Sequence, residues 1–146
     1  MAASGDTLYA VLRASASDQV VALQVSDLAN IGKLPLAGRV RFGPASAGGL
    51  VFIADEKNLL ALESGNMARW SQPLTHGLPA RAPLKVGADL IVVYLDGTVS
   101  RVSAESGEEL ATGTIGQFAG SAVAVLGEQI AVAGADGTLH TLPLPK

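Results

Sequence analysis

The sequence has no cysteine and only two histidines, His76 and His140. The missing thiol excludes disulfide scaffolds, thiolate metal sites and cysteine nucleophiles, and two histidines are too few for a histidine-rich metal centre. The sequence also lacks the Gly-x-Ser-x-Gly motif of a serine nucleophile and the phosphate-binding Walker loop. We therefore expect no cofactor, no metal ion and no catalytic residue in this chain.

Positive charge is scarce, with 10 lysines and arginines against 13 aspartates and glutamates. The net charge of −3 lacks the basic footprint of a general nucleic-acid binder, so no nucleic-acid partner is expected. No apolar run approaches the roughly 18 residues of a membrane-spanning helix, and residues 1–10 do not resemble a signal peptide. We expect no direct membrane insertion. The compartment stays open, and an extracytoplasmic one is compatible with excision from a larger protein.

Apolar residues, by contrast, are plentiful. They make up 49% of the 146 residues, whereas charged residues make up 16%. Such a composition is typical of a folded chain with its own core rather than of a disordered one, and the length fits one domain. The expected domain spans residues 1–146.

The sequence repeats itself with a period of about 40 residues. The segment LIVVYLDGTV at 90–99 returns as IAVAGADGTL at 130–139, with the Asp-Gly-Thr triplets aligned. A related segment, LVFIADEKNL, occupies 50–59, and a looser copy begins at Leu8. Repeats of this length indicate one supersecondary unit per copy. The expected repeats lie near 4–39, 40–75, 76–116 and 117–143.

Each repeat is expected to consist of short antiparallel strands. Asp-Gly between apolar runs predicts a two-residue hairpin, because that turn needs residues with positive φ. In the second repeat the expected strands lie near 44–47, 49–54, 58–63 and 67–72. In the third they lie near 83–87, 89–95, 98–103 and 108–113. The first and last repeats are expected to hold three strands each, so the fold class is all-β.

The central strands are apolar without alternation: residues 90–95 give six apolar positions in a row and residues 50–54 give five. A strand with one wet face would alternate, so these strands are expected to be covered on both faces. Small sheets stacked radially have this property. The expected architecture is therefore a β-propeller, with blades of about 40 residues and about 3.5 blades in the chain.

The pattern Leu-Leu-Ala-Leu-Glu-Ser-Gly at 59–65, followed by Trp70, resembles the propeller repeat of the pyrroloquinoline-quinone type, found in quinoproteins. Residues 99–108 resemble it too, although Ala111 and Leu34 stand where a tryptophan closes the blade. The resemblance implies a propeller in which Trp70 fills the gap between blades. Enzymes of this family oxidise substrates with a bound quinone, but this chain is short for a full ring and has none of the cysteines that many of them carry.

Fewer than four complete blades cannot close a well-packed ring, because the outermost blades would leave apolar faces in water. The chain is thus expected to form either an incomplete ring or a ring closed by a second chain. Since two copies would give about eight blades, self-association as a homodimer is the favoured expectation.

Three residues are candidates for a binding site on loops or in the central channel: Arg41, His76 and Arg81. The arginines lie on or near strands that open a blade, where a propeller lines its channel, and His76 lies in a connection between blades. The alternative is that the arginines form weak surface ion pairs and that His76 is a solvated loop residue. Asp96 and Asp136 are interpreted as turn residues rather than calcium ligands, because each turn offers a single carboxylate.

These observations favour a non-catalytic propeller module that binds a protein or peptide partner, or that serves as an assembly scaffold. Recognition would use the connections near 40–48, 73–82 and 113–121 and the exposed edges of the end blades. The alternative is a fragment of a quinoprotein-like or carbohydrate-processing enzyme whose active centre lies outside this chain. Resemblance of fold alone does not transfer catalysis.

Overall fold

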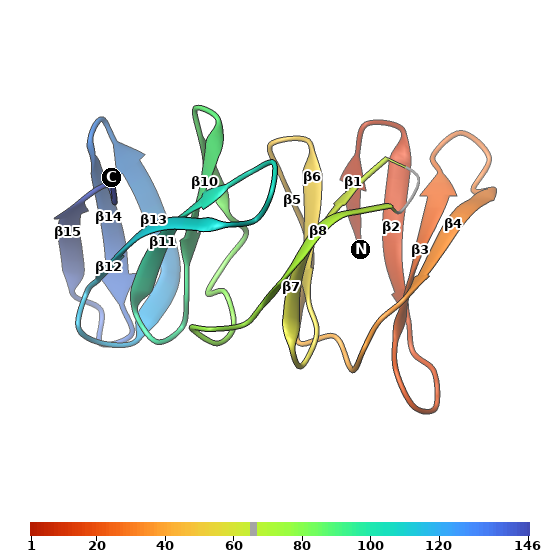
Figure 1. Ribbon diagram of the computed structural model, residues 1–146, viewed down its shortest axis with the longest axis horizontal. Coiled ribbons are helices and arrows are strands. Elements are labelled where there is room, and N and C mark those ends of the chain that lie inside the picture. The colour runs from red at the N-terminus through yellow and green to blue at the C-terminus, as the bar shows by residue number, and fades with distance from the viewer. Residues whose placement is uncertain (65–66) are drawn as a thin grey trace. The chain divides into compact units, whose positions relative to one another are not determined.

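The computed structural model describes residues 1–64 and 67–146, and its ordered elements are β-strands that form four antiparallel sheets (Figure 1). No helix in these described ranges is long and apolar enough to cross a membrane. The all-β prediction is confirmed, and we refer to the four sheets as blades 1 to 4. The chain divides into two compact units, unit 1 (Met1–Leu74) and unit 2 (Thr75–Lys146), each with two blades. One domain over 1–146 stays a prediction.

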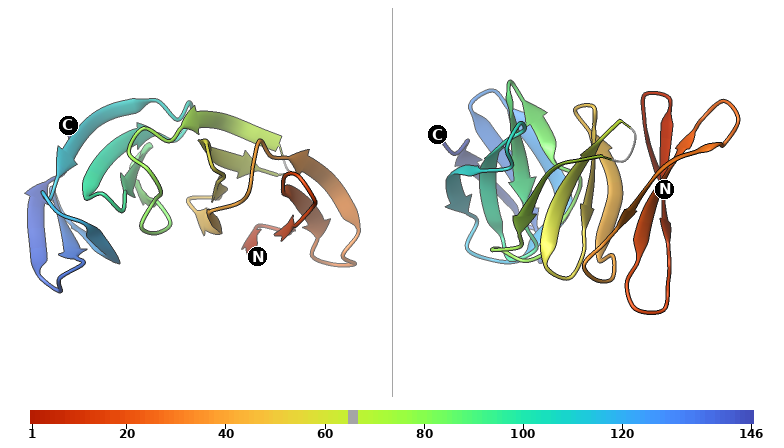
Figure 2. Two further views of the ribbon diagram at one scale, coloured as in Figure 1. Left: turned by 90° about the horizontal axis from the view of Figure 1, so that it is seen from below. Right: turned by 45° about the vertical axis from the view of Figure 1, so that its right-hand side comes forward.

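Unit 1 contains blades 1 and 2. Blade 1 consists of β1 (Ala2–Ser4), β2 (Thr7–Leu12), β3 (Gln19–Gln24) and β4 (Asn30–Pro35). Blade 2 consists of β5 (Phe42–Ala47), β6 (Leu50–Ala54), β7 (Asn58–Glu63) and β8 (Met67–Pro73). In both blades each strand pairs with its neighbour in the sequence, and β1 lies against β5 and β6 (Figure 2).

Unit 2 contains blades 3 and 4. Blade 3 consists of β9 (Leu84–Val86), β10 (Asp89–Val93), β11 (Thr98–Ser103) and β12 (Glu109–Thr114). Blade 4 consists of β13 (Ala119–Leu126), β14 (Gln129–Gly134) and β15 (Leu139–Pro143). The strands of repeats two and three lie within a few residues of their predicted positions, and the last repeat has its predicted three strands.

The prediction of three strands in the first repeat was wrong. Ala2, Ala3 and Ser4 pair with Tyr9, Leu8 and Thr7, so blade 1 has a fourth strand. Alanine and serine carry little β-propensity, and the strand has only three residues, so no sequence signal marks it. Its stability comes from the pairing itself and from its contact with blade 2.

In unit 1 the core lies between the two blades. Tyr9, Val20 and Ala22 of blade 1 pack against Val51, Ile53, Leu60 and Leu62 of blade 2. All five residues of β6 are buried, as the unbroken apolar run predicts for a strand covered on both faces. Trp70 is 7% exposed, and its ring lies 6.0 Å from that of Phe52, which confirms it as a core residue. Gly65, part of the pattern at 59–65, lies outside the described residues.

In unit 2 the equivalent core joins blades 3 and 4. Ile91, Val93 and Val99 of blade 3 pack with Ala119, Ile130 and Val132 of blade 4. The prediction of two-residue hairpins was wrong. The amides of Tyr94 and Gly134 donate to the carbonyls of Thr98 and Thr138, so each loop holds three residues, 95–97 and 135–137. Positive φ occurs only at the glycine of each loop, 91° at Gly97 and 86° at Gly137. The carboxylates of Asp96 and Asp136 accept hydrogen bonds from the amides of Thr98 and Thr138, so both serve their own turns.

Candidate functional site

A row of polar side chains crosses one end of blade 1. The register pairs Ser4 with Thr7 and Thr7 with Gln24, so these three residues lie side by side on one face of the sheet. Side chains alternate between the faces of a strand, and therefore Thr7 shares its face with Tyr9, two residues further along. Tyr9 belongs to the core between the blades of unit 1. The row of Ser4, Thr7 and Gln24 thus lies on the same face of blade 1 as the apolar core, at the edge of that core.

Blade 2 supplies the facing wall through the β5–β6 turn and the ends of β7 and β8. Ser4 Oγ donates a hydrogen bond to the carbonyl oxygen of Gly49 over 2.9 Å, and the Tyr9 hydroxyl donates to the carbonyl oxygen of Glu63 over 2.6 Å. Gly49 has a φ of 83°, a conformation that glycine adopts without strain. These two bonds fix the distance between the walls.

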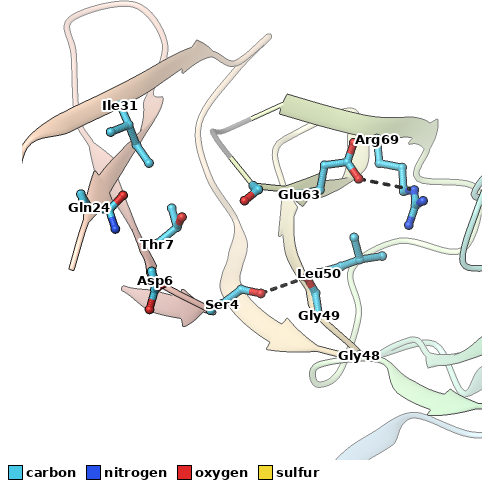
Figure 3. A pocket seen from close by; sticks show the side chains of 12 residues that line it. Ser4, Asp6, Thr7, Gln24, Ile31, Gly48, Gly49, Leu50, Glu63 and Arg69 are labelled. Atoms are coloured by element: carbon cyan, nitrogen blue, oxygen red, sulfur yellow. Dashed lines mark hydrogen bonds and ion pairs between the residues drawn. The ribbon is translucent and has the colours of Figure 1, made fainter. Parts of the chain in front are cut away.

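Between the walls lies a pocket of about 760 Å³, which we call the Thr7 pocket. Its lining includes Asp6, Thr7, Gln24, Leu50, Glu63 and Arg69. Figure 3 shows Thr7, Gln24 and Ile31 on one side, and Leu50, Glu63 and Arg69 on the other. Both sides belong to unit 1, so the pocket is a feature of one compact unit.

The charges of the Thr7 pocket are unbalanced. Among the described residues that line it are two carboxylates, Asp6 and Glu63, and one cation, Arg69. The Glu63–Arg69 pair is held at 3.7 Å by one contact, and its side chains are 45% and 42% exposed. An exposed pair of this kind contributes only about 0–1 kcal/mol. The pocket therefore keeps an acidic character, with carboxylate oxygens that can accept further hydrogen bonds.

Thr7 is 4% exposed, yet no hydrogen bond of its hydroxyl is found in the described ranges 1–64 and 67–146. A buried hydroxyl without a partner costs free energy, because it has lost its water and gained nothing in return. Unpaired buried polar groups are uncommon in folded proteins and are concentrated where ligands bind. This residue, which the sequence reasoning missed, is the most unusual side chain of the pocket.

Arg41 immediately precedes β5 in unit 1. Its backbone amide donates to the carbonyl of Ala54 over 2.8 Å, and its guanidinium donates to Glu56 Oε1 over 2.8 Å. It lines a smaller hollow of about 390 Å³ beside Val11 and Arg13, separate from the Thr7 pocket. The described partners of Arg41 thus form the surface ion pair that the alternative interpretation anticipates, and a binding role for Arg41 stays a prediction.

His76 lies in unit 2, in the connection that leads to β9. Its Nε2 lies 2.8 Å from Glu109 Oε2, the same oxygen that accepts a hydrogen bond from the Ser100 hydroxyl over 2.7 Å. Its ring packs on Tyr94 at 5.2 Å between centroids. Burial, followed by the charges of Glu109 and Asp96, raises the pKa of Tyr94 to about 12. His76 is therefore held by Glu109 and Tyr94 while its side chain stays 26% exposed, and a binding role for it stays a prediction.

Arg81 also lies in unit 2, where its guanidinium donates to the carbonyl oxygens of Val123 over 3.0 Å and of Ala82 over 3.3 Å. It borders a hollow of about 410 Å³ on blade 4 that is lined otherwise by Ala, Val and Leu side chains. No hydrogen bond or ion pair between Arg81 and His76 occurs among the described residues. The three predicted binding residues thus have three different sets of partners, and a shared site stays a prediction.

Comparison with known proteins supports the fold alone. No protein-family model and no curated protein sequence matches the chain. BamB from Moraxella catarrhalis is similar over 98% of this chain and 49% of its own, at 16% identity and a TM-score of 0.67. The WD40 domain of Toxoplasma gondii coronin is similar over 95% of this chain and 40% of its own, at 14% identity and a TM-score of 0.62. Both are β-propellers, so the sheets of this chain are propeller-like blades.

The chain spans about half the length of BamB and less than half the length of the coronin chain. The computationally designed protein Ika4 is similar over 97% of this chain and 87% of its own, at 11% identity and a TM-score of 0.65.

Proposed function

We propose that the chain is a non-catalytic propeller module, with blades of the quinoprotein type, that self-associates and binds a protein or peptide partner. The observation that carries the proposal is blade 4, which has three strands where each of the other blades has four. On the side of β15 away from β14, the described part of the chain provides no further strand. Unpaired strand edges are sites where another chain can add a strand.

The face of blade 4 supports the same proposal. Leu126 and Leu139 are 60% and 71% exposed, and with Ala122, Ala124 and Ala131 they border the apolar hollow next to Arg81. Exposed apolar side chains that cluster in this way are typical of interaction surfaces. The occupant we propose is a second copy of the chain, because two copies approximate the length of one BamB chain, of which this chain covers 49%.

A non-catalytic role is supported by the chemistry of the Ser100–Glu109–His76 cluster. In a serine nucleophile, the histidine takes the hydroxyl proton directly. Here Ser100 donates to Glu109, and the same carboxylate oxygen bonds His76, so the carboxylate lies between the hydroxyl and the base. This order differs from that of a Ser-His-Asp triad, in which the histidine contacts the hydroxyl.

Static light scattering at two protein concentrations tests the proposal. We expect the mass of two chains at the higher concentration, and a shift toward one chain in Leu139→Lys, which places a charge on the face of blade 4. Leu110→Lys, on β12 and 49% exposed, is the matched control and should keep the mass of the unmodified protein. A mass of one chain at both concentrations would contradict self-association.

A further inference from the structure

We propose that the Thr7 pocket binds the side chain of an arginine in a peptide partner. The inference deepens the peptide-binding role proposed above and rests on it. It assigns a site and a ligand chemistry to that role, in unit 1, far along the chain from the blade 4 surface proposed for self-association.

The first argument is the unmet hydrogen-bonding capacity of the pocket. Thr7 is 4% exposed and its hydroxyl is unpartnered in the described ranges, and Gln24, its cross-strand neighbour, carries an amide oxygen. Ser4 on the other side is already bound to Gly49. A ligand that reaches the row therefore meets acceptors at Thr7 and Gln24 for which residues 1–64 and 67–146 provide no hydrogen bond.

The second argument is charge. Asp6 and Glu63 outnumber Arg69, and Arg69 contacts Glu63 at only 3.7 Å. A cation entering the pocket gains attraction from two carboxylates, and it displaces a weak exposed pair rather than a buried one. An anion would meet the opposite field.

The third argument is shape and composition. A guanidinium carries five donors in one plane and no acceptor, which matches a lining of hydroxyl, amide and carboxylate oxygens. Leu50 and Ile31 supply apolar surface for the alkyl stem of the same side chain. The volume of about 760 Å³ exceeds that of one side chain, so it leaves room for the flanking peptide backbone.

Arg69 distinguishes this proposal from an anion site. Because Arg69 competes with an incoming guanidinium for Glu63, Arg69→Ala should tighten binding of a cationic ligand. The same substitution would weaken an anion site, because Arg69 is the one cation among the described residues of the lining. Lys33→Ala is the matched control, since Lys33 is an exposed cation of β4 outside the lining and its loss changes the net charge equally.

The experiment is a titration of the ¹⁵N-labelled chain with the peptide acetyl-Gly-Arg-Gly-amide, followed by NMR. We expect saturable shifts at the amides of Thr7, Gln24 and Gly49, and none with the same peptide carrying neutral citrulline. Glu63→Gln should weaken binding about tenfold, whereas Glu105→Gln, an exposed carboxylate of unit 2, should leave it unchanged. Arg69→Ala should tighten it a few-fold.

Thr7→Val separates ligand binding from folding. Valine has the shape of threonine without the hydroxyl, so removal of an unpartnered buried polar group should raise the melting temperature. The same variant should bind the arginine peptide more weakly. A purely structural Thr7 would give the first result without the second.

The proposal is overturned if the arginine peptide gives no saturable shifts, or if the citrulline peptide gives equal shifts. A loss of peptide affinity in Arg69→Ala would overturn it as well. Light scattering on the same samples keeps this result distinct from the proposed self-association. A two-chain mass without peptide binding rejects the pocket alone, and peptide binding by a single chain rejects self-association alone.

Discussion

In unit 1 the segment that joins blade 1 to blade 2, residues 36–41, is held by two buried carboxylates. Asp18 Oδ2 accepts from the amide of Val40 over 3.0 Å, and Asp18 Oδ1 accepts from Arg39 over 3.1 Å. Asp55 Oδ2 accepts from the amide of Ala37 over 3.2 Å. Asp18 and Asp55 are each 1% exposed, so the segment is fixed from both blades by acceptors that water does not reach.

In unit 2 the equivalent segment, residues 115–119, is held by backbone contacts and a glutamine. The amides of Ile115 and Ala119 donate to the carbonyls of Gly97 and Leu95, both over 3.0 Å. The Gln117 side chain donates to Asp136 Oδ1 over 3.1 Å, on a turn that is exposed to solvent. Backbone hydrogen bonds hold both segments, since Leu36, Gly38 and Arg41 also make them in unit 1. Unit 1 differs in adding two buried carboxylates, whereas unit 2 adds a close approach of Gly97 to the backbone of Gln117.

The largest loss of stability should come from a side chain placed between Gly97 and the backbone of Gln117 in unit 2. A Cβ on Gly97 would lie 1.9 Å from the carbonyl oxygen of Gln117, and the φ of 91° disfavours any branched residue. Gly97→Val should therefore lower the free energy of unfolding by about 3–5 kcal/mol. Urea unfolding followed by circular dichroism measures it.

Gly137→Val is the matched control for Gly97→Val. Gly137 has a similar φ of 86°, but a Cβ there would meet nothing within 4 Å. The control should cost only the backbone strain, about 1–3 kcal/mol. Equal losses in the two variants would mean that the contact with Gln117 contributes nothing.

A smaller loss of unfolding free energy should follow from removal of Asp55 or Gln117, the side chains that hold the segments between blades. Asp55 also accepts from the amides of Lys57 and Asn58, both over 2.8 Å, in addition to Ala37. Asp55→Ala strands these donors and should cost about 2–4 kcal/mol. Gln117→Ala should cost about 0.5–1.5 kcal/mol, because its partners Asp136 and Thr138 are exposed, His140 is half-buried, and its backbone carbonyl is retained. The same unfolding measurement applies, and a larger loss in Gln117→Ala would reverse the comparison between the units.

The fold was predictable where local signals agree with one another. Gly97 and Gly137 carry the positive φ expected of a turn glycine, although each loop is one residue longer than predicted, and the apolar runs before them form β10 and β14 of blades 3 and 4. Turn chemistry and apolar runs are properties of a few adjacent residues, so they can be interpreted without knowledge of the rest of the chain. Strand β1 has neither signal, and its pairing was missed for that reason.

The Thr7 pocket was not predictable by the same reasoning. It depends on the register that places Ser4, Thr7 and Gln24 in one row, and on a turn of another blade that carries Gly49. Register and contact between blades are tertiary properties, and an isolated threonine at a strand end gives no sign that its hydroxyl will be buried. A predicted β1 would have been the one clue, because it would have set Ser4 opposite Thr7.

The smallest effect concerns pH. The Val40 amide, followed in effect by the Arg39 side chain, holds the pKa of Asp18 below its ordinary value of 3.8, despite the opposing effect of burial. A carboxyl whose pKa is lower in the folded state stabilises the fold above the unfolded value, and this stabilisation is lost as the pH falls through the folded pKa. Unfolding free energy should therefore decline below about pH 4, and Asp18→Asn should flatten that decline while lowering stability at neutral pH.

Asp136 in unit 2 provides the matched case. The Thr138 hydroxyl and amide lower the pKa of Asp136 as well, so the sign of its effect is the same. Because Asp136 is exposed and Asp18 is not, added salt should weaken the contribution of Asp136 and leave that of Asp18 nearly unchanged. Urea unfolding from pH 3 to pH 7 at low and high salt, for Asp18→Asn and Asp136→Asn, measures both. The same salt dependence in the two variants would show that Asp18 is no better shielded from water than Asp136 in its exposed turn.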